Sequence, residues 1–375
     1  MNESEEAGRP RWAATDPHGF VVSDGAPAVR DDYELPAPVR DAYEERAPVR
    51  DGYEAPVRVQ DVDGPDLPAV AALGAPAHSG PKAPSYPPVP QGLPAVAGDL
   101  AAAVLPDIVL DGAAYPGVTV RAASVRGDSH RYAGEPRQDA LCVTRIGGDE
   151  QGGELLMLAV ADGVGSAPRS HVGSNEACRL AARYLDRSTS LHEAIRTADA
   201  EGFQRAADNV VRQIGNLLGD LALQHDERPD ALATTLRILL VPLDPRIRTR
   251  GFLAVGDGGA ALLRRGFWHL DFMGDADGGK DGDVIDTRTA ALPRARTAVT
   301  RLIHPAQPGD VIVLSTDGLS SPLAGDAGMR DFLKEAWTGA EVPAPADFLW
   351  QFQYRVKSYD DDRTAVVLWE HGEAQ

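Results

Sequence analysis

Aspartates at the ends of apolar runs are the residues of this chain best suited to chemistry. Asp139 directly precedes the run ALCVTRI, and Asp162 directly follows the run LLMLAVA. The segment 147–153 between the runs is rich in glycine and predicts a turn. A hairpin folded about a midpoint between residues 150 and 151 makes Asp139 and Asp162 face each other. Two carboxylates so placed repel each other and raise one pKa unless a cation lies between them.

Three further aspartates repeat this pattern. Asp317 follows the run VIVLST, Asp361 lies just before the run RTAVVLW, and Asp257 follows FLAVG between glycines. If these runs are antiparallel neighbours, the end of one strand meets the start of the next, and up to five carboxylates gather at one end of a sheet. Clustered oxygen ligands without nearby His or Cys favour magnesium or manganese. Two such cations about 4 Å apart can activate a water and bind phosphate oxygens.

The elements that must position these acids are strands and a few helices. Strand-like runs begin at Val118 and end at Trp369, and most are bounded by Gly, Pro or Asp. Apolar residues recurring every three or four positions predict helices over 170–185, over 191 to about 223, and over 327–337. Strands, a helical pair, more strands and a final helix predict an α+β fold with mostly antiparallel sheets.

Composition narrows the function classes. The chain has 375 residues, with 37 Lys and Arg against 56 Asp and Glu, a net charge of −19. This charge repels phosphate backbones, so we expect no nucleic-acid partner. Two cysteines cannot form a disulfide framework, the first residues show no signal peptide, and no apolar run is long enough for a membrane span. We therefore expect a cytoplasmic protein with no membrane contact.

The first part of the chain differs from the rest. Of 29 prolines, 18 lie at or before Pro116, and helix or strand periodicity is not sustained there. We predict a disordered Pro/Ala-rich tail over 1–114, followed by one catalytic domain over 115–372. Within 29–58 a ten-residue repeat presents Tyr33, Tyr43 and Tyr53. The repeat is either a low-complexity linker or a multivalent docking tail for a partner.

Six blocks of the chain resemble the bacterial form of the metal-dependent type-2C protein serine/threonine phosphatases. In chain order the blocks are Arg137-Gln138-Asp139-Ala140, Ala161-Asp162-Gly163-Val164-Gly165-Ser166, Ala233-Thr234-Thr235, Val255-Gly256-Asp257, Ser315-Thr316-Asp317-Gly318-Leu319 and Asp361-Asp362-Arg363-Thr364. The resemblance implies an antiparallel β-sandwich flanked by helices on both faces, with a two-metal centre at one end.

The resemblance also implies a role for each acid. Asp162 would bridge two Mn or Mg ions, and the carbonyl of Gly163 would bind the first. Asp317 and Asp361 would bind the second, Asp139 would act mainly through water, and Asp257 with Asp317 would suit a weak third ion.

Some positions depart from the family pattern. Many members carry a phosphate-binding arginine five residues before the first aspartate, where this chain has Gly134. Arg131 or Arg137 could substitute, and we take Arg131 as the candidate catalytic cation. His130 could also contact substrate. Val164 stands where eukaryotic relatives have a histidine that is a proposed general acid, and glycines follow Asp257 in place of the usual Ser-Arg.

The sequence therefore predicts a monomeric hydrolase that removes phosphate from phosphoserine or phosphothreonine in proteins. Asp139, Asp162 and Arg131 are its candidate catalytic residues, and its partner is a phosphorylated protein substrate. The alternative is a non-catalytic binding or scaffold module on the same fold, which the missing arginine and the altered Gly-Asp block would suit.

Overall fold

The computed structural model describes residues 78–79, 85–86, 92–94, 104–148, 153–270, 272 and 291–372. All of them belong to one compact unit that spans Leu73–Gln375. The repeat at 29–58 lies outside the described residues. None of the helices within the described ranges has the length and apolar character needed to cross a membrane.

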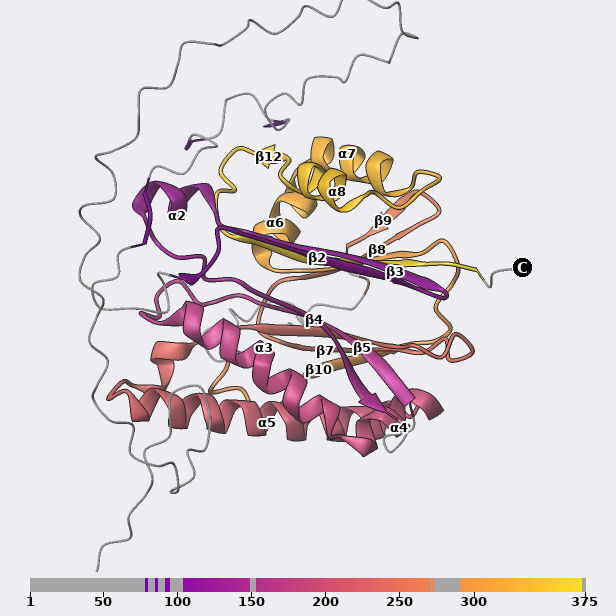
Figure 1. Ribbon diagram of the computed structural model, residues 1–375, viewed down its shortest axis with the longest axis horizontal. Coiled ribbons are helices and arrows are strands. Elements are labelled where there is room, and N and C mark those ends of the chain that lie inside the picture. The colour runs from indigo at the N-terminus through magenta and orange to yellow at the C-terminus, as the bar shows by residue number, and fades with distance from the viewer. Residues whose placement is uncertain are drawn as a thin grey trace, which may run out of the picture. The chain divides into compact units, whose positions relative to one another are not determined.

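Two antiparallel sheets face each other in the centre of the fold (Figure 1). The five-stranded sheet has the order β10-β7-β6-β5-β4. Its strands are β4 (Ala140–Gly148), β5 (Gly153–Ala161), β6 (Leu236–Pro242), β7 (Arg250–Val255) and β10 (Val299–Ile303). The six-stranded sheet has the order β2-β3-β13-β11-β8-β9. Its strands are β2 (Ile108–Tyr115), β3 (Val118–Val125), β8 (Gly259–Arg264), β9 (Phe267–His269), β11 (Val311–Ser315) and β13 (Arg363–Glu370).

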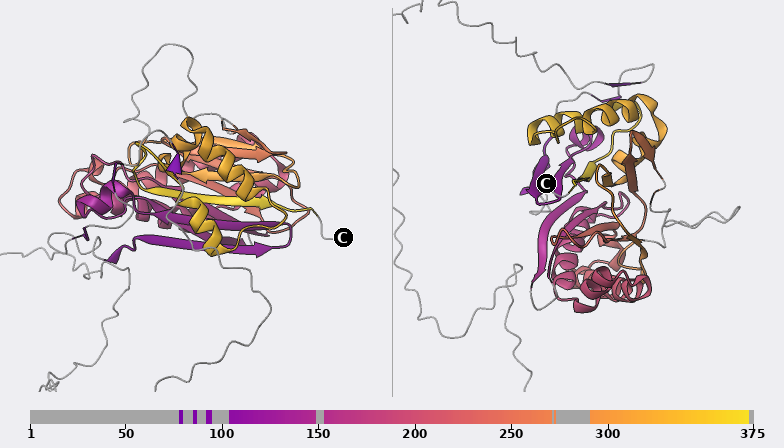
Figure 2. Two further views of the ribbon diagram at one scale, coloured as in Figure 1. Left: turned by 90° about the horizontal axis from the view of Figure 1, so that it is seen from above. Right: turned by 90° about the vertical axis from the view of Figure 1, so that its right-hand side faces the viewer.

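Helices cover the outer face of each sheet (Figures 1 and 2). The five-stranded sheet is covered by α3 (Ser170–Asp186), α4 (Thr189–Thr197) and α5 (Ala200–Gln224), and the 3-10 turn η2 (Pro229–Leu232) packs on α3 and α5. The six-stranded sheet is covered by α6 (Asp317–Gly325), α7 (Ala327–Trp337) and α8 (Pro345–Phe352). The predicted fold class, an α+β antiparallel sandwich flanked by helices on both faces, is confirmed.

Burial on both faces explains the continuous apolar runs. In β5, Met157 and Ala159 face the helices, while Leu156 and Leu158 face the other sheet. Successive side chains of a strand point to opposite faces, so a strand between a helix layer and a second sheet needs apolar residues at every position. The three apolar layers that result hold both sheets in place.

Two predicted boundaries differ from the structure. The helix predicted from 191 to about 223 is divided into α4 and α5 because Ala198 adopts the left-handed conformation, with φ 54°, and the Asp199 side chain caps α5 by accepting a hydrogen bond from the Gly202 amide. The first sheet strand, β2, begins at Ile108, ahead of the domain boundary predicted at 115. It is an edge strand with mostly exposed residues, so it lacks an apolar run.

Parts of the predicted tail also contact the folded unit. The short strand β1 (His78–Ser79) pairs with β12 (Arg355–Val356). The Gly92 amide donates a hydrogen bond to the carbonyl of Arg131 in α2 (Asp128–Ala133), and the rings of Tyr86 and Tyr132 lie 5.3 Å apart. These contacts fix segments that precede 104 onto α2 and β12.

Candidate metal centre

Asp139 and Asp162 lie at the same end of the β4–β5 hairpin. Ala140 pairs with Ala161 and Gly148 with Gly153, which is the register predicted from the midpoint. Asp139 is 1% exposed, and its Oδ2 accepts a hydrogen bond of 2.8 Å from Thr316 Oγ1. The hairpin therefore places two carboxylates at one edge, as predicted.

The neighbouring ends of β11 and β13 bring in two more carboxylates. Ser315 pairs with Ala365, so Asp317, the first residue of α6, lies beside the segment that enters β13 after Asp361. The Thr316 amide donates to the Thr364 carbonyl at 3.0 Å. The prediction that these strands are antiparallel neighbours is confirmed, and it sets Asp317 and Asp361 at the same edge.

Asp257 reaches the cluster through the turn between β7 and β8. Gly259 pairs with Ser315, which brings this turn next to Asp317, and the Asp257 charge helps to raise the pKa of Asp317. Arg237 donates hydrogen bonds to the carbonyls of Asp257 (2.9 Å) and Gly256 (3.1 Å). Asp257 itself is exposed, which leaves its carboxylate accessible.

Gly163 and its neighbours fix the backbone beside Asp162. A Cβ at Gly163 would lie 2.8 Å from the Ser170 side chain and 2.9 Å from the Gln138 carbonyl oxygen, so this position is restricted to glycine. The Asp162 amide donates to Thr235 Oγ1 at 3.0 Å, and its carbonyl accepts from the Thr235 amide at 2.8 Å. The short segment at Thr234 and Thr235 therefore holds the central acid in place.

The cluster is electrostatically unfavourable without a cation. Burial is the largest cause that raises the pKa values of Asp139, Asp162, Asp317 and Asp361, and the neighbouring carboxylates raise them further. Asp317 Oδ1 is buried and accepts no hydrogen bond from the residues that the structure describes. Buried carboxylate oxygens without donors and an all-oxygen donor set fit hard divalent cations.

Asp362 ties the first acidic motif to the last. It is 2% exposed; its Oδ1 accepts from the Gly127 amide (2.6 Å) and His130 Nδ1 (2.9 Å). Its Oδ2 accepts from the amides of Gln138 (2.5 Å) and Asp139 (3.3 Å). Asp362 was given no role from the sequence, although its place beside Asp361 in the closing motif was a signal that the pair divides two tasks.

His130 is a cation that faces the cluster. Its Nε2 lies 4.0 Å from Asp361 Oδ1 and 3.7 Å from Glu135 Oε2. Burial alone lowers the pKa of His130, but the hydrogen bond with Asp362 and the charges of Asp362, Asp361 and Glu135 outweigh burial and raise it to about 9. The imidazole is therefore protonated at neutral pH, one residue from the predicted Arg131.

Arg131 is turned away from the carboxylate cluster. Its Nη2 donates to Asp107 Oδ2 at 2.6 Å and its Nε to Asp107 Oδ1 at 3.1 Å, while Nη1 lies 3.6 Å from Asp128 Oδ1. Asp107 precedes β2 and was not among the acids singled out from the sequence. Sequence spacing placed Arg131 near the site, but the guanidinium direction depends on a carboxylate from a different part of the chain.

Two cavities border the cluster on different sides. One, of about 320 Å³, has Asp360 and Asp361 in its wall. The other, of about 510 Å³, has Asp257 and Val164 in its wall. Asp361 and Asp257 are thus accessible from these cavities.

Several solved structures are similar to this chain at low sequence identity. PppA, a key regulatory component of T6SS in Pseudomonas aeruginosa, is 18% identical with TM-score 0.43, over 69% of this chain and 100% of its own. The S. agalactiae serine/threonine phosphatase is 15% identical with TM-score 0.46, over 68% and 100%. The PPM Ser-Thr phosphatase MsPP from Mycobacterium smegmatis, in complex with cacodylate, is 22% identical with TM-score 0.44, over 68% and 98%.

No curated protein matches the chain. The family model described as Protein phosphatase 2C matches residues 126–349, which is more than half of the chain and includes Asp139, Asp162, Asp257 and Asp317. The chain belongs to the protein phosphatase 2C family.

Proposed function

We propose that this chain is a metal-dependent protein serine/threonine phosphatase. The observation that carries the proposal is the buried carboxylate cluster at one end of the sandwich, in which Asp317 Oδ1 has no donor among the described residues. Family membership supports the hydrolysis of a phosphate ester as the reaction.

Asp162, the carbonyl of Gly163, Asp317 and Asp361 would hold two Mn or Mg ions. Asp257 with Asp317 would hold a weak third ion. When bound, these ions polarise a water for attack on phosphorus and neutralise the phosphoryl oxygens.

The chain's own residues orient the site. Thr316 donates to Oδ2 of the buried Asp139 carboxylate and so fixes its direction, and Asp139 would act mainly through water. His130, held by Asp362, supplies a positive charge next to Asp361. We propose His130 for the role in phosphate binding that the sequence suggested for Arg131, because His130 Nε2 faces Asp361 of the cluster while the Arg131 guanidinium pairs with Asp107.

We propose a phosphorylated protein as the substrate and a monomeric state, with the repeats at 29–58 as either a linker or a docking tail for a partner. The scaffold alternative stays open because the phosphate-binding arginine of many relatives is replaced by Gly134. A scaffold needs no acids at the metal positions, whereas this chain keeps Asp162, Asp317 and Asp361.

The test is phosphate release from a phosphothreonine peptide and from para-nitrophenyl phosphate, with manganese and with excess chelator. We expect turnover with manganese and its loss in chelator. For a variant of a cluster acid such as Asp317→Asn, Asp331→Asn is a suitable control, because Asp331 is an exposed acid on α7 that pairs with Lys334 on the same helix. Turnover that persists in chelator contradicts metal dependence, and a parent chain inactive on every phosphopeptide favours the scaffold.

A further inference from the structure

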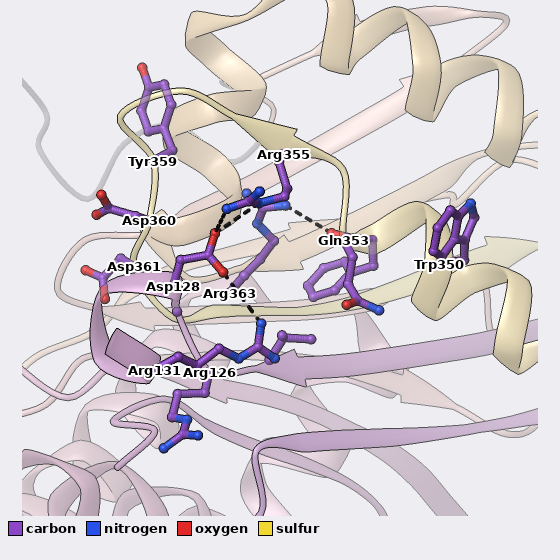
Figure 3. A pocket seen from close by; sticks show the side chains of 13 residues that line it. Arg126, Asp128, Arg131, Trp350, Gln353, Arg355, Tyr359, Asp360, Asp361 and Arg363 are labelled. Carbon is purple, nitrogen blue, oxygen red and sulfur yellow. Dashed lines mark hydrogen bonds and ion pairs between the residues drawn. The ribbon is translucent and has the colours of Figure 1, made fainter. Parts of the chain in front are cut away.

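A cavity lined by arginines lies beside the carboxylate cluster. It has a volume of about 320 Å³ and lies between α2 and the segment 350–363. Arginines from different parts of the chain contribute to its wall, together with Asp128 and the aromatic residue Trp350 (Figure 3). These arginines are Arg126, Arg131, Arg355 and Arg363. Because Asp361 belongs to this wall and to the cluster, a ligand in the cavity is adjacent to the proposed metal site.

The arginines of the cavity outnumber the carboxylates that form ion pairs with them within the described residues. Arg126 and Arg131 share Asp107, while Arg355 donates to Asp128 Oδ2 through Nε (3.0 Å) and Nη2 (2.5 Å). The two carboxylates therefore serve three guanidinium groups. Asp360 and Asp361 also lie in the wall, but neither carboxylate forms an ion pair with these arginines within the described residues, and Asp361 is a proposed metal ligand.

Arg363 has no carboxylate partner among the described residues. Its guanidinium donates there to main-chain carbonyls, those of Gly318 (2.9 Å), Phe352 (3.0 Å) and Tyr354 (2.5 Å). The residue is 9% exposed. The charge of Asp128 acts on Arg363, but Asp128 is already paired with Arg355. Two guanidinium groups that share one carboxylate favour a further anion in the adjoining cavity.

We propose that this cavity is a substrate subsite for an oxyanion, a side-chain carboxylate or second phosphoryl group near the phosphorylated residue. This inference rests on the proposed phosphatase function and adds its substrate class, a phosphoprotein with an acidic group next to the dephosphorylated residue. The volume is at the low end for ligand pockets, which fits one side chain better than a free cofactor. Arg355 is the residue that would bind the anion. Its Nε and Nη2 make hydrogen bonds within the described residues, and its Nη1 makes none there.

The test uses a series of phosphothreonine peptides, each with one glutamate at a different flanking position. Each is compared with a reference phosphothreonine peptide that has alanine at all flanking positions. A further series carries a non-hydrolysable phosphonate analogue of phosphoserine at the best position, which separates a carboxylate from a phosphoryl ligand. The measured quantity is the ratio of kcat/KM values for acidic and neutral peptides. We expect a ratio of about 10 at one position in the parent, the effect of one hydrogen-bonded ion pair.

Two variants should move this ratio in opposite directions. Arg355→Gln removes the guanidinium that would bind the anion and should bring the ratio to about 1. Asp128→Asn removes the carboxylate that pairs with Arg355 and should raise the ratio. Damage to the fold would not raise the ratio in either variant. Arg294→Gln is the matched control, since Arg294 lines the cavity on the Asp257 side and pairs there with Asp230. Its ratio should equal that of the parent.

The proposal is overturned if the parent shows no preference at any position, or if Arg294→Gln lowers the ratio as much as Arg355→Gln. If the chain hydrolyses no peptide, the proposed function fails, and the subsite is then decided by fluorescence anisotropy with the same labelled peptides. Binding of the acidic peptide that weakens about 10-fold in Arg355→Gln supports the subsite without catalysis. Equal binding of acidic and neutral peptides refutes it.

Discussion

Replacing Asp362 with asparagine should weaken the hydrogen bonds between the first and the last acidic motif and lower the pKa of His130. Both oxygens of Asp362 accept hydrogen bonds, so the NH2 group of an introduced asparagine would face hydrogen-bond donors in place of either oxygen. An NH2 group on the Oδ2 side would face two backbone amides, those of Gln138 and Asp139, which cannot accept. On the Oδ1 side it would face the Gly127 amide and His130 Nδ1, and a neutral imidazole can accept a hydrogen bond at Nδ1. The introduced asparagine should therefore take this second orientation.

The part of the stability cost that does not depend on pH follows from the backbone hydrogen bond that is lost. The Gly127 amide, 2.6 Å from Oδ1 in the parent, is left without its acceptor. Losing a hydrogen bond to a charged group costs about 1.5–3 kcal/mol. Removal of a charge that raises the pKa of Asp139 offsets part of this cost. For a domain of this size we expect this part of the cost to lower the melting temperature by no more than about 12 °C.

The decisive assay is an NMR titration of His130 in chelator-treated protein. In the parent the pKa of His130 is raised from 6.5 to about 9, and in Asp362→Asn it should move back toward 6.5 because burial is no longer outweighed by the Asp362 charge. The raised pKa of His130 stabilises the parent fully below pH 6.5, and this contribution is lost as pH rises through 9. The free energies of unfolding of parent and variant should therefore converge over that range.

Asp360→Asn is the matched control. It removes a carboxylate of the same acidic segment, but the causes that raise the pKa of His130 are the charges of Asp362, Asp361 and Glu135. The Asp360 carbonyl keeps its hydrogen bonds from Ser129 in this variant. Its His130 should titrate as in the parent. A pKa that stays near 9 in Asp362→Asn would refute the account of Asp362 as the group that keeps His130 charged.

Three further predictions test the cluster and its frame. Asp317→Asn should lower turnover about 100-fold or more with manganese, while the melting temperature without metal holds or rises because a buried carboxylate with a raised pKa has been removed. A chain lacking 1–72 should melt like the full chain in calorimetry, whereas one lacking 1–114 loses β2 and should melt lower by more than about 5 °C; equal melting would contradict the assignment of β2 to the sheet. Gly318→Ala should lose turnover and melt lower, because its Cβ would overlap the Asp362 carbonyl oxygen; unchanged turnover would show that this contact is not needed to place Asp361.

The carboxylate cluster could be predicted from sequence because the positions of turns and apolar runs determine which residues of neighbouring strands pair. The turn at 147–153 and the apolar runs on either side determine the hairpin register, and this register brings Asp139 opposite Asp162. Because β11 and β13 are antiparallel neighbours, the end of β11 lies beside the start of β13, which brings Asp317 close to Asp361. Strands buried on both faces are also recognisable by their continuous apolar runs, whereas the exposed edge strand β2 has no such run.

The cations of the site could not be predicted in the same way. A long side chain near an acidic cluster points where its partners are, and those partners come from distant parts of the chain. Arg131 lies one residue from His130, yet Asp107 draws its guanidinium away while Asp362 holds the imidazole against the cluster. The sequence spacing of the two residues is nearly the same, so the carboxylate that each one pairs with decides which of them faces the carboxylate cluster. The positive groups that we propose for substrate recognition are therefore assigned by their ion pairs, and the same reasoning leads to Arg355 in the neighbouring cavity.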